Sequence, residues 1–190
     1  MHESPSHVFA VKLLAHLTRH RSNSKPIVFR LRSIVPALVT ATYSENDESR
    51  KYACYALQNL AQDKPCRQEL AITNNLLTAL CHRARQGSAP EERLAAIRAL
   101  KNLTDEPANL IPMTNTPECF ATLMQIAHAS DDSITETMQY LGCDALATLS
   151  HWFRSIATSG QRMEALKHKQ TPSKDLFVPS LKIVAWQQWQ

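Results

Sequence analysis

The side chains best suited to chemistry in this sequence do not form a catalytic or metal-binding motif. His16 and His20 lie four residues apart and could face one side of a helix as a metal pair, but no third ligand is near them in the sequence. Cys81 and His82 are neighbours that point in different directions on a helix. HExxH, GxSxG and P-loop patterns are absent. We therefore expect no enzymatic activity, no metal ion and no cofactor.

The cysteines predict free thiols in a reducing compartment. Their number is odd, and no two of them form a CxxC pair. The first residues are polar, unlike a secretory signal peptide. No apolar run approaches the roughly 18 residues that span a bilayer. We expect an intracellular protein, cytoplasmic or nuclear, with no membrane span. The five residues are Cys54, Cys66, Cys81, Cys119 and Cys143.

Positive charge is concentrated near the amino terminus. The chain has 21 basic and 17 acidic residues and a formal net charge of +4. A segment without acids could bind nucleic acid or another acidic partner through phosphate or carboxylate contacts. It could equally be a solvated helix end and loop. Its members are Lys12, Arg19, Arg21, Lys25, Arg30 and Arg32.

A pattern of small residues and leucines recurs about every 43 residues. Its clearest copies are ACYALQNLA at 53–61 and AIRALKNLT at 96–104, and weaker copies lie at 10–18 and 142–150. We call the residue before the last leucine the anchor position. The anchors are separated by 43, 43 and 46 residues, and they are His16, Asn59, Asn102 and Thr148. This periodicity predicts a solenoid of helical repeats.

The columns around the anchor describe one buried helix stripe. Leucines stand two positions before the anchor and one position after it, and a small residue stands six before it. A small residue there allows a neighbouring helix to approach closely. Cys54 and Cys143 share a column with valine and isoleucine, so we expect both thiols to be packing residues.

Two shorter helical segments are expected between consecutive anchor helices. We expect them at 64–72 and 76–85, and at 108–113 and 118–128. Thr116, followed by Pro117, predicts a helix start. Ser88 to Glu91 is typical of a capping box at the start of the third anchor helix, with Gly87 ending the helix before it.

Three helices in about 43 residues, with Ala-Leu-x-Asn-Leu on the last, resemble the armadillo repeat over nearly the whole chain. The resemblance implies an all-α, right-handed α-solenoid of about four repeats, forming a single domain over 1–190. The HEAT repeat is the alternative. The glycine that usually separates the first two helices is missing, and Asn75 and Asn115 are candidates to replace it. Residues 181–186 resemble a degraded fifth anchor helix, so 170–190 would be a last repeat or a cap.

The resemblance also implies a function as a protein-interaction scaffold. In armadillo proteins the third helices line a concave groove, and the conserved asparagine binds the main chain of an extended peptide. Asn59 and Asn102 would take that role here. Alternatively, they bond their own solenoid backbone. Armadillo proteins that bind basic peptides carry tryptophans four positions before the anchor, whereas only Tyr55 is aromatic there. The predicted groove residues are Lys12, His16, Tyr55, Asn59, Arg98, Asn102, Asp144, Thr148 and Trp152.

The sequence leaves the ligand and the oligomeric state open. The partner is expected to be a protein or peptide of unknown identity. Uncapped solenoid ends could stack on one another.

Overall fold

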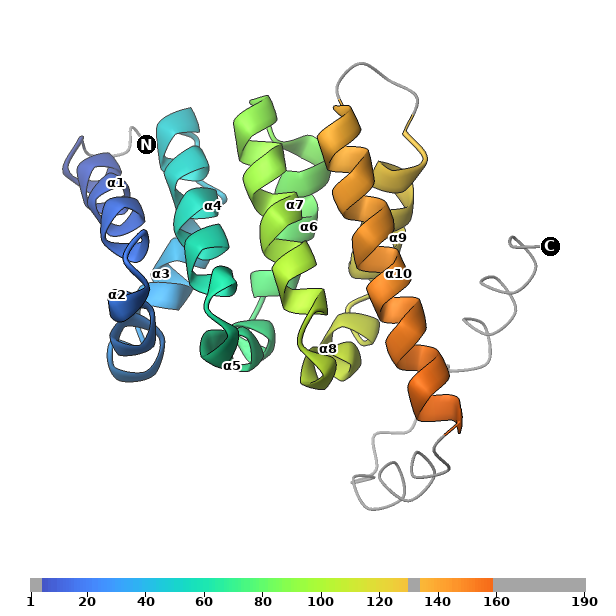
Figure 1. Cartoon of the computed structure of the whole chain (residues 1–190). Helices are drawn as coiled ribbons and strands as arrows, with labels where there is room; N and C mark the ends of the chain where they lie inside the picture. The colour runs from blue at the N-terminus through green and yellow to red at the C-terminus, as the bar shows by residue number, and fades with distance from the viewer. Residues whose placement is uncertain (1–4, 130–133, 159–190) are drawn as a thin grey trace, which may run out of the picture. The chain divides into compact units, whose positions relative to one another are not determined.

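A computed structural model describes residues 5–129 and 134–158, with side chains placed to residue 155 (Figure 1). Within these ranges the chain is all-α and contains no β-strand. The helices are α1 (Pro5–Thr18), α2 (Arg21–Lys25), α3 (Ile34–Ala41), α4 (Asp47–Gln62), α5 (Arg67–Ile72), α6 (Leu76–Gln86), α7 (Pro90–Thr104), α8 (Leu110–Thr114), α9 (Pro117–Ala127) and α10 (Glu136–Thr158).

Two compact units divide the chain at Trp152. The first unit, Met1–Trp152, contains all helices up to most of α10. Of the second unit, Phe153–Gln190, only the end of α10 is described. The expected cap at 170–190, with its apolar segment 181–186, lies outside the described residues.

Four of the long helices carry the repeated leucine pattern. In the first unit, α1, α4, α7 and α10 follow one another side by side (Figure 1). Helix α4 packs against both α1 and α7, while α6 packs against α7 and α9. The predicted anchor helices therefore exist, and each lies beside the next although about 43 residues separate their anchors.

The leucine columns form the core on α4, α7 and α10, as expected, but not on α1, where Leu14 is half-buried and Leu17 is exposed. Leu57, Leu60, Leu100 and Leu103 are each at most 1% exposed. Burial of one such side chain contributes about 1.5–3 kcal/mol relative to leaving it in water. Gly142, the smallest member of the small column, lies so close to α9 that a Cβ would stand 3.2 Å from the Ala127 nitrogen.

The shorter segments were predicted with small shifts. Segment 64–72 begins as a 3-10 turn at Lys64–Cys66 and continues as α5. Segment 108–113 likewise begins as a 3-10 turn at Pro107–Asn109 before α8. A π-helical turn at Pro26–Arg30 joins α2 to the loop before α3. Each of these three turns has a proline at its first or second position. Proline favours the start of a helical turn, because it lacks the N–H that a first turn leaves unpaired.

Two predictions about helix ends were wrong, at Ser88 and Asn115, and those at Thr116 and Asn75 are confirmed. The N-cap of α7 is Ala89, not Ser88, because the Ser88 hydroxyl donates to the Asp47 carboxylate at 3.1 Å. Thr116 is the N-cap of α9, but its hydroxyl donates to the Pro112 carbonyl instead of capping the helix. Asn115 has a right-handed backbone with φ −81°. Asn75 does adopt the left-handed conformation, with φ 58°.

Candidate functional site

The nine predicted groove residues come from the four anchor helices, and none of them is fully buried. Lys12 and His16 lie on α1, and Tyr55 and Asn59 lie on α4. Helix α7 carries Arg98 and Asn102. Helix α10 carries Asp144, Thr148 and Trp152. His16 and Arg98 are exposed, and the other seven are half-buried. We call these nine residues the anchor face.

Asn59 bonds within the protein. Its amide nitrogen donates to the Ala15 carbonyl and to the Thr18 hydroxyl of α1, both at 3.3 Å. These bonds tie α4 to α1 across the stack. The alternative interpretation of the anchor asparagines, a bond to their own fold, therefore describes Asn59 in this structure.

Asn102 differs from Asn59, although it occupies the same column. Its half-buried amide makes no hydrogen bond with any part of the chain that the structure describes. One difference lies on the preceding helix. Position +2 from the anchor is Thr18 on α1 but Ala61 on α4, so the hydroxyl that accepts from Asn59 has no counterpart for Asn102. Asn102 thus keeps both a donor and an acceptor for a ligand.

An aromatic and cationic cluster lies where α1 meets α4. The Lys12 Nζ lies 5.1 Å from the centroid of the Tyr52 ring, which is cation–π distance. The ring centroids of His16 and Tyr52 are 6.4 Å apart. The Tyr55 ring packs edge to face on the Tyr52 ring, with the centroids 6.2 Å apart. Sequence reasoning missed Tyr52, although its place one helical turn before Tyr55 was a usable signal.

Burial raises the pKa of the Tyr55 phenol, and the carboxylate of Glu91 acts in the same direction. The phenol therefore stays protonated at neutral pH and can donate a hydrogen bond. Arg98, on the next helix, is exposed, and its guanidinium is near enough to oppose part of this shift. Tyr55, Arg98 and Asn102 form the part of the anchor face that is best able to bind a ligand.

The α10 members of the anchor face hold helices together. Asp144 forms an ion pair with Lys101 of α7 at 3.1 Å. The Trp152 indole N–H donates to the Thr104 carbonyl at 3.2 Å. The Thr148 hydroxyl donates to the Asp144 carbonyl one turn earlier on the same helix. The contacts of Asp144 and Trp152 therefore position α10 against α7, whereas that of Thr148 stays within α10.

Lys101 is the centre of the polar contact between α7 and α10. Its ammonium group bonds the carboxylates of Asp105, at 3.0 Å, and of Asp144. Burial alone would lower the pKa of Lys101, but the hydrogen bonds to the two carboxylates outweigh it and raise the pKa. The amine therefore stays charged well into the alkaline range.

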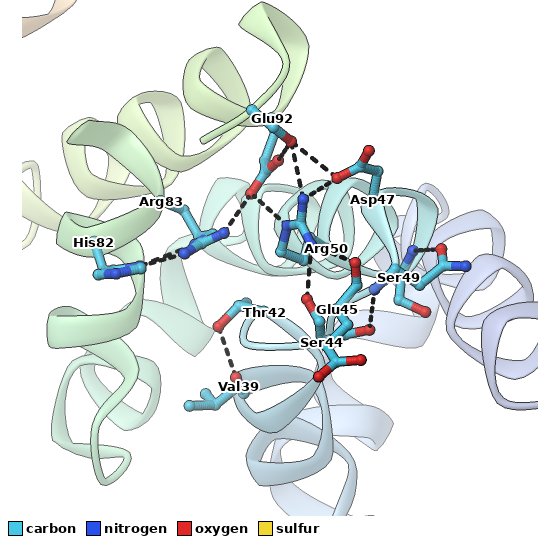
Figure 2. A network of polar contacts seen from close by, with 12 residues as sticks. Val39, Thr42, Ser44, Glu45, Asp47, Ser49, Arg50, His82, Arg83 and Glu92 are labelled. Atoms are coloured by element: carbon cyan, nitrogen blue, oxygen red, sulfur yellow. Dashed lines mark hydrogen bonds and ion pairs between the residues drawn. The ribbon is translucent and has the colours of Figure 1, made fainter. Parts of the chain in front are cut away.

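A buried carboxylate, which the sequence did not indicate, crosslinks three helices (Figure 2). Glu92 of α7 is fully buried and bonds Arg83 of α6 at 3.2 Å. Arg50 of α4 lies 3.7 Å from the same oxygen and also donates to the Ser44 carbonyl. Ser88 donates to the second oxygen at 3.3 Å. The signal in the sequence was only an acid in a first helical turn, which the helix dipole already explained.

The basic amino-terminal residues are exposed as a group. Within the described residues these five cations form no ion pair, and the half-buried Lys12 lies over the Tyr52 ring instead. The structure thus leaves their charges in solvent near α2 and the turn after it. They are Arg19, Arg21, Lys25, Arg30 and Arg32.

Metal binding finds no support in the described part of the chain. No group of three histidine, cysteine or acidic residues gathers there as metal ligands would.

Cys54, Cys66, Cys81 and Cys119 are buried free thiols, which agrees with the packing role expected for Cys54. Cys143 is exposed, so the same expectation was wrong for Cys143. Among described helices, none is both long and apolar enough to cross a membrane.

Comparisons with known proteins add little to this geometry. No family model matches the chain, and no curated protein matches it. A crystal structure of an engineered protein, a target of the Northeast Structural Genomics Consortium, is 19% identical. The match covers 88% of this chain and 83% of that chain with a TM-score of 0.38. A likeness at this level carries no argument about fold or function.

Proposed function

We propose that this chain is a right-handed solenoid of about four armadillo-type repeats that acts as a protein-interaction scaffold rather than an enzyme. Three features support the proposal. The anchor residues recur at intervals of 43, 43 and 46 residues, their helices lie side by side (Figure 1), and the leucine columns of α4, α7 and α10 lie in the core. Solenoids of this kind present one continuous surface of aligned helices to a ligand.

The ligand that we propose is an extended segment of another protein, bound along the anchor face. The observation that carries this proposal is the amide of Asn102, which is half-buried and has no partner in the described chain. An extended main chain offers one N–H and one C=O to such an amide. Tyr55 and exposed Arg98 would contact the side chains of the segment. Because Asn59 and the α10 residues are engaged within the fold, binding would centre on α4 and α7.

A peptide-selection experiment tests this proposal. Peptides selected from a random phage-displayed library on the wild-type chain would be titrated against Asn102→Ala by fluorescence anisotropy. We expect about tenfold weaker binding, since two hydrogen bonds of roughly 0.5–1.5 kcal/mol each are lost. Asn115→Ala is the matched control, because Asn115 is exposed on the turn before α9. Failure to enrich any peptide, or equal binding by Asn102→Ala, would refute the proposal.

A second proposal follows from the exposed basic residues of the amino-terminal region. Five cations without ion pairs among the described residues could bind nucleic acid or another acidic partner through phosphate-like charges. The triple variant Arg19→Ala, Arg21→Ala, Lys25→Ala should then bind single- and double-stranded oligonucleotides more weakly. Binding by the wild type should also fall steeply as salt is raised. Anisotropy that shows no salt-sensitive binding at micromolar protein would exclude this function.

A further inference from the structure

The first anchor helix exposes columns that are buried in every later anchor helix. Counted from the anchor, these are positions −6, −3 and +1. The buried sets are Ala53, Ala56 and Leu60 on α4, Ala96, Ala99 and Leu103 on α7, and Gly142, Ala145 and Leu149 on α10. On α1 the same positions are Ala10, Leu13 and Leu17, and all three are exposed.

The last anchor helix shows the converse pattern. Positions −5 and +2 are buried on α1 as Val11 and Thr18, on α4 as Cys54 and Ala61, and on α7 as Ile97 and Thr104. On α10 they are Cys143 and Ser150, and both are exposed. Ala147, at position −1, is exposed as well, whereas Ala15 in the same column of α1 is buried.

Hydrogen bonds between neighbouring anchor helices explain why α1 and α10 expose different positions. Asn59 of α4 reaches back to Ala15 and Thr18, which are positions −1 and +2 of α1. Trp152 of α10 reaches back to Thr104, position +2 of α7. One edge of each anchor helix thus packs on the opposite edge of the helix before it. Helix α1 exposes the backward edge, and α10 exposes the forward edge.

The two exposed edges are complementary in size. The α1 edge consists of Phe9, Ala10, Leu13 and Leu17, and its large members are 68%, 49% and 43% exposed, in that order. The α10 edge consists of small residues, Cys143, Ala147 and Ser150, with Tyr140 at one end. Between Phe9 and Leu17 on α1, and between Tyr140 and Ser150 on α10, neither edge includes a charged residue, and Glu136 and Arg154 flank the α10 edge one turn out at each end. Large side chains from one helix fit between small ones on another when helices pack ridges into grooves.

We propose that the α1 edge of one copy of this chain binds the α10 edge of a second copy, head to tail. The contact continues the packing that already joins α1 to α4 and α7 to α10, so each copy extends the stack of the other. Because the two surfaces differ, the contact is heterologous and leaves one free edge at each end of the pair. Association therefore proceeds beyond a dimer as concentration rises. It requires the helix packing described above and is independent of peptide binding.

Sedimentation velocity of the full chain tests this contact. The wild type should sediment faster as its concentration rises, past the value for a dimer. Leu13→Glu and Ala147→Glu each place a charge in one edge, so each variant alone should remain monomeric. Ile111→Glu, on α8, is the matched control, since Ile111 is 57% exposed outside both edges, and it should behave as the wild type. Circular dichroism establishes that the variants are folded, and Leu17→Glu and Ser150→Glu replace any that is not.

Mixing the two edge variants decides whether the contact is head to tail. Leu13→Glu retains an intact α10 edge, and Ala147→Glu retains an intact α1 edge. An equimolar mixture should form a dimer that does not grow further. Monomeric wild type at concentrations up to about 1 mM would overturn the proposal, since a Kd near about 1 mM would already be visible there. A mixture that stays monomeric would overturn it as well, because one intact edge of each kind would then be present without binding.

Discussion

Asn59 and Asn102 occupy the same column, yet one is bonded within the fold and the other is not. One difference between their surroundings lies on the preceding helix. Thr18 supplies a hydroxyl acceptor to Asn59, and Ala61 supplies none to Asn102. Chemistry at a repeated position therefore depends on the neighbouring repeat. This is why Asn102, and not both asparagines, is the residue on which we base the proposed peptide contact.

Glu92 shows the same dependence in the core. Its carboxylate is fully buried, with Arg83 and Arg50 as partners (Figure 2). The Ser88 hydroxyl donates to its second oxygen. Arg83 and Arg50 are themselves only about a tenth exposed. Removing the Glu92 carboxylate therefore leaves the buried Arg83 without an anion, whereas Arg50 keeps the carboxylate of Asp47.

We expect Glu92→Ala to lower the free energy of unfolding by about 3–5 kcal/mol, the usual cost of breaking one side of a buried ion pair. Urea denaturation followed by circular dichroism would measure this. Glu91→Ala is the matched control, because Glu91 is exposed on the same helix turn and should change stability by less than about 0.5 kcal/mol. Equal effects of the two substitutions would show that the buried network does not stabilise the fold.

At the scale of helices, proline and asparagine decide where segments begin. Pro90 and Pro117 start α7 and α9 at the first position, where a missing N–H costs nothing. Asn75 turns the chain between α5 and α6 with a left-handed backbone. Asn115, the candidate for the same task before α9, keeps a right-handed backbone. The two turns thus reach a similar helix arrangement by different backbone paths.

Substitutions at the two asparagines should therefore differ. Asn75→Ala should lower the free energy of unfolding by about 1 kcal/mol, because alanine tolerates the left-handed region less well than asparagine does. Asn75→Gly should be close to neutral or slightly stabilising, since glycine adopts positive φ without strain. Asn115→Ala should have almost no effect. Thermal unfolding of the three variants would check this order, and a loss at Asn115 as large as that at Asn75 would contradict it.

At the scale of the molecule, burial raises the pKa values of several thiols and phenols. It raises the pKa of the Cys54 thiol, and it raises that of Cys66 to about 12. The pKa values of Tyr43 and Tyr55 are raised by burial as well. In the unfolded chain these thiols and phenols would return to ordinary pKa values near about 8.5 and about 10. At these four groups the folded state therefore holds the proton to higher pH than the unfolded state does.

The sign of the pH dependence follows from this difference. Above about pH 7.5 the thiols of the unfolded chain begin to lose protons that the folded chain keeps, so the free energy of unfolding falls as pH rises. The contribution is fully present below that pH. We expect urea midpoints that are constant from about pH 7 to about pH 7.5 and lower at about pH 10. Cys54→Ala should show a smaller alkaline decrease, and a flat profile for the wild type would contradict the prediction.

The sequence by itself determined the helical class and the register of the core. Leu57, Leu60, Leu100 and Leu103 could be placed from periodicity alone, because a helix with a fixed stripe must bury that stripe against a neighbour. Helix ends at Gly87 and Pro117 could be predicted for similarly local reasons. The capping box at Ser88 could not, since its hydroxyl bonds Asp47 on another helix.

Only the tertiary structure decided which polar groups are bonded to one another. The pairing of Glu92 with Arg83 and Arg50, of Lys101 with Asp144, and of Trp152 with the Thr104 carbonyl joins different helices. Residues that are about 9 to 48 positions apart come into contact through helix packing, and local periodicity holds no information on those distances. The free amide of Asn102 and the exposed edges of α1 and α10 became visible for the same reason.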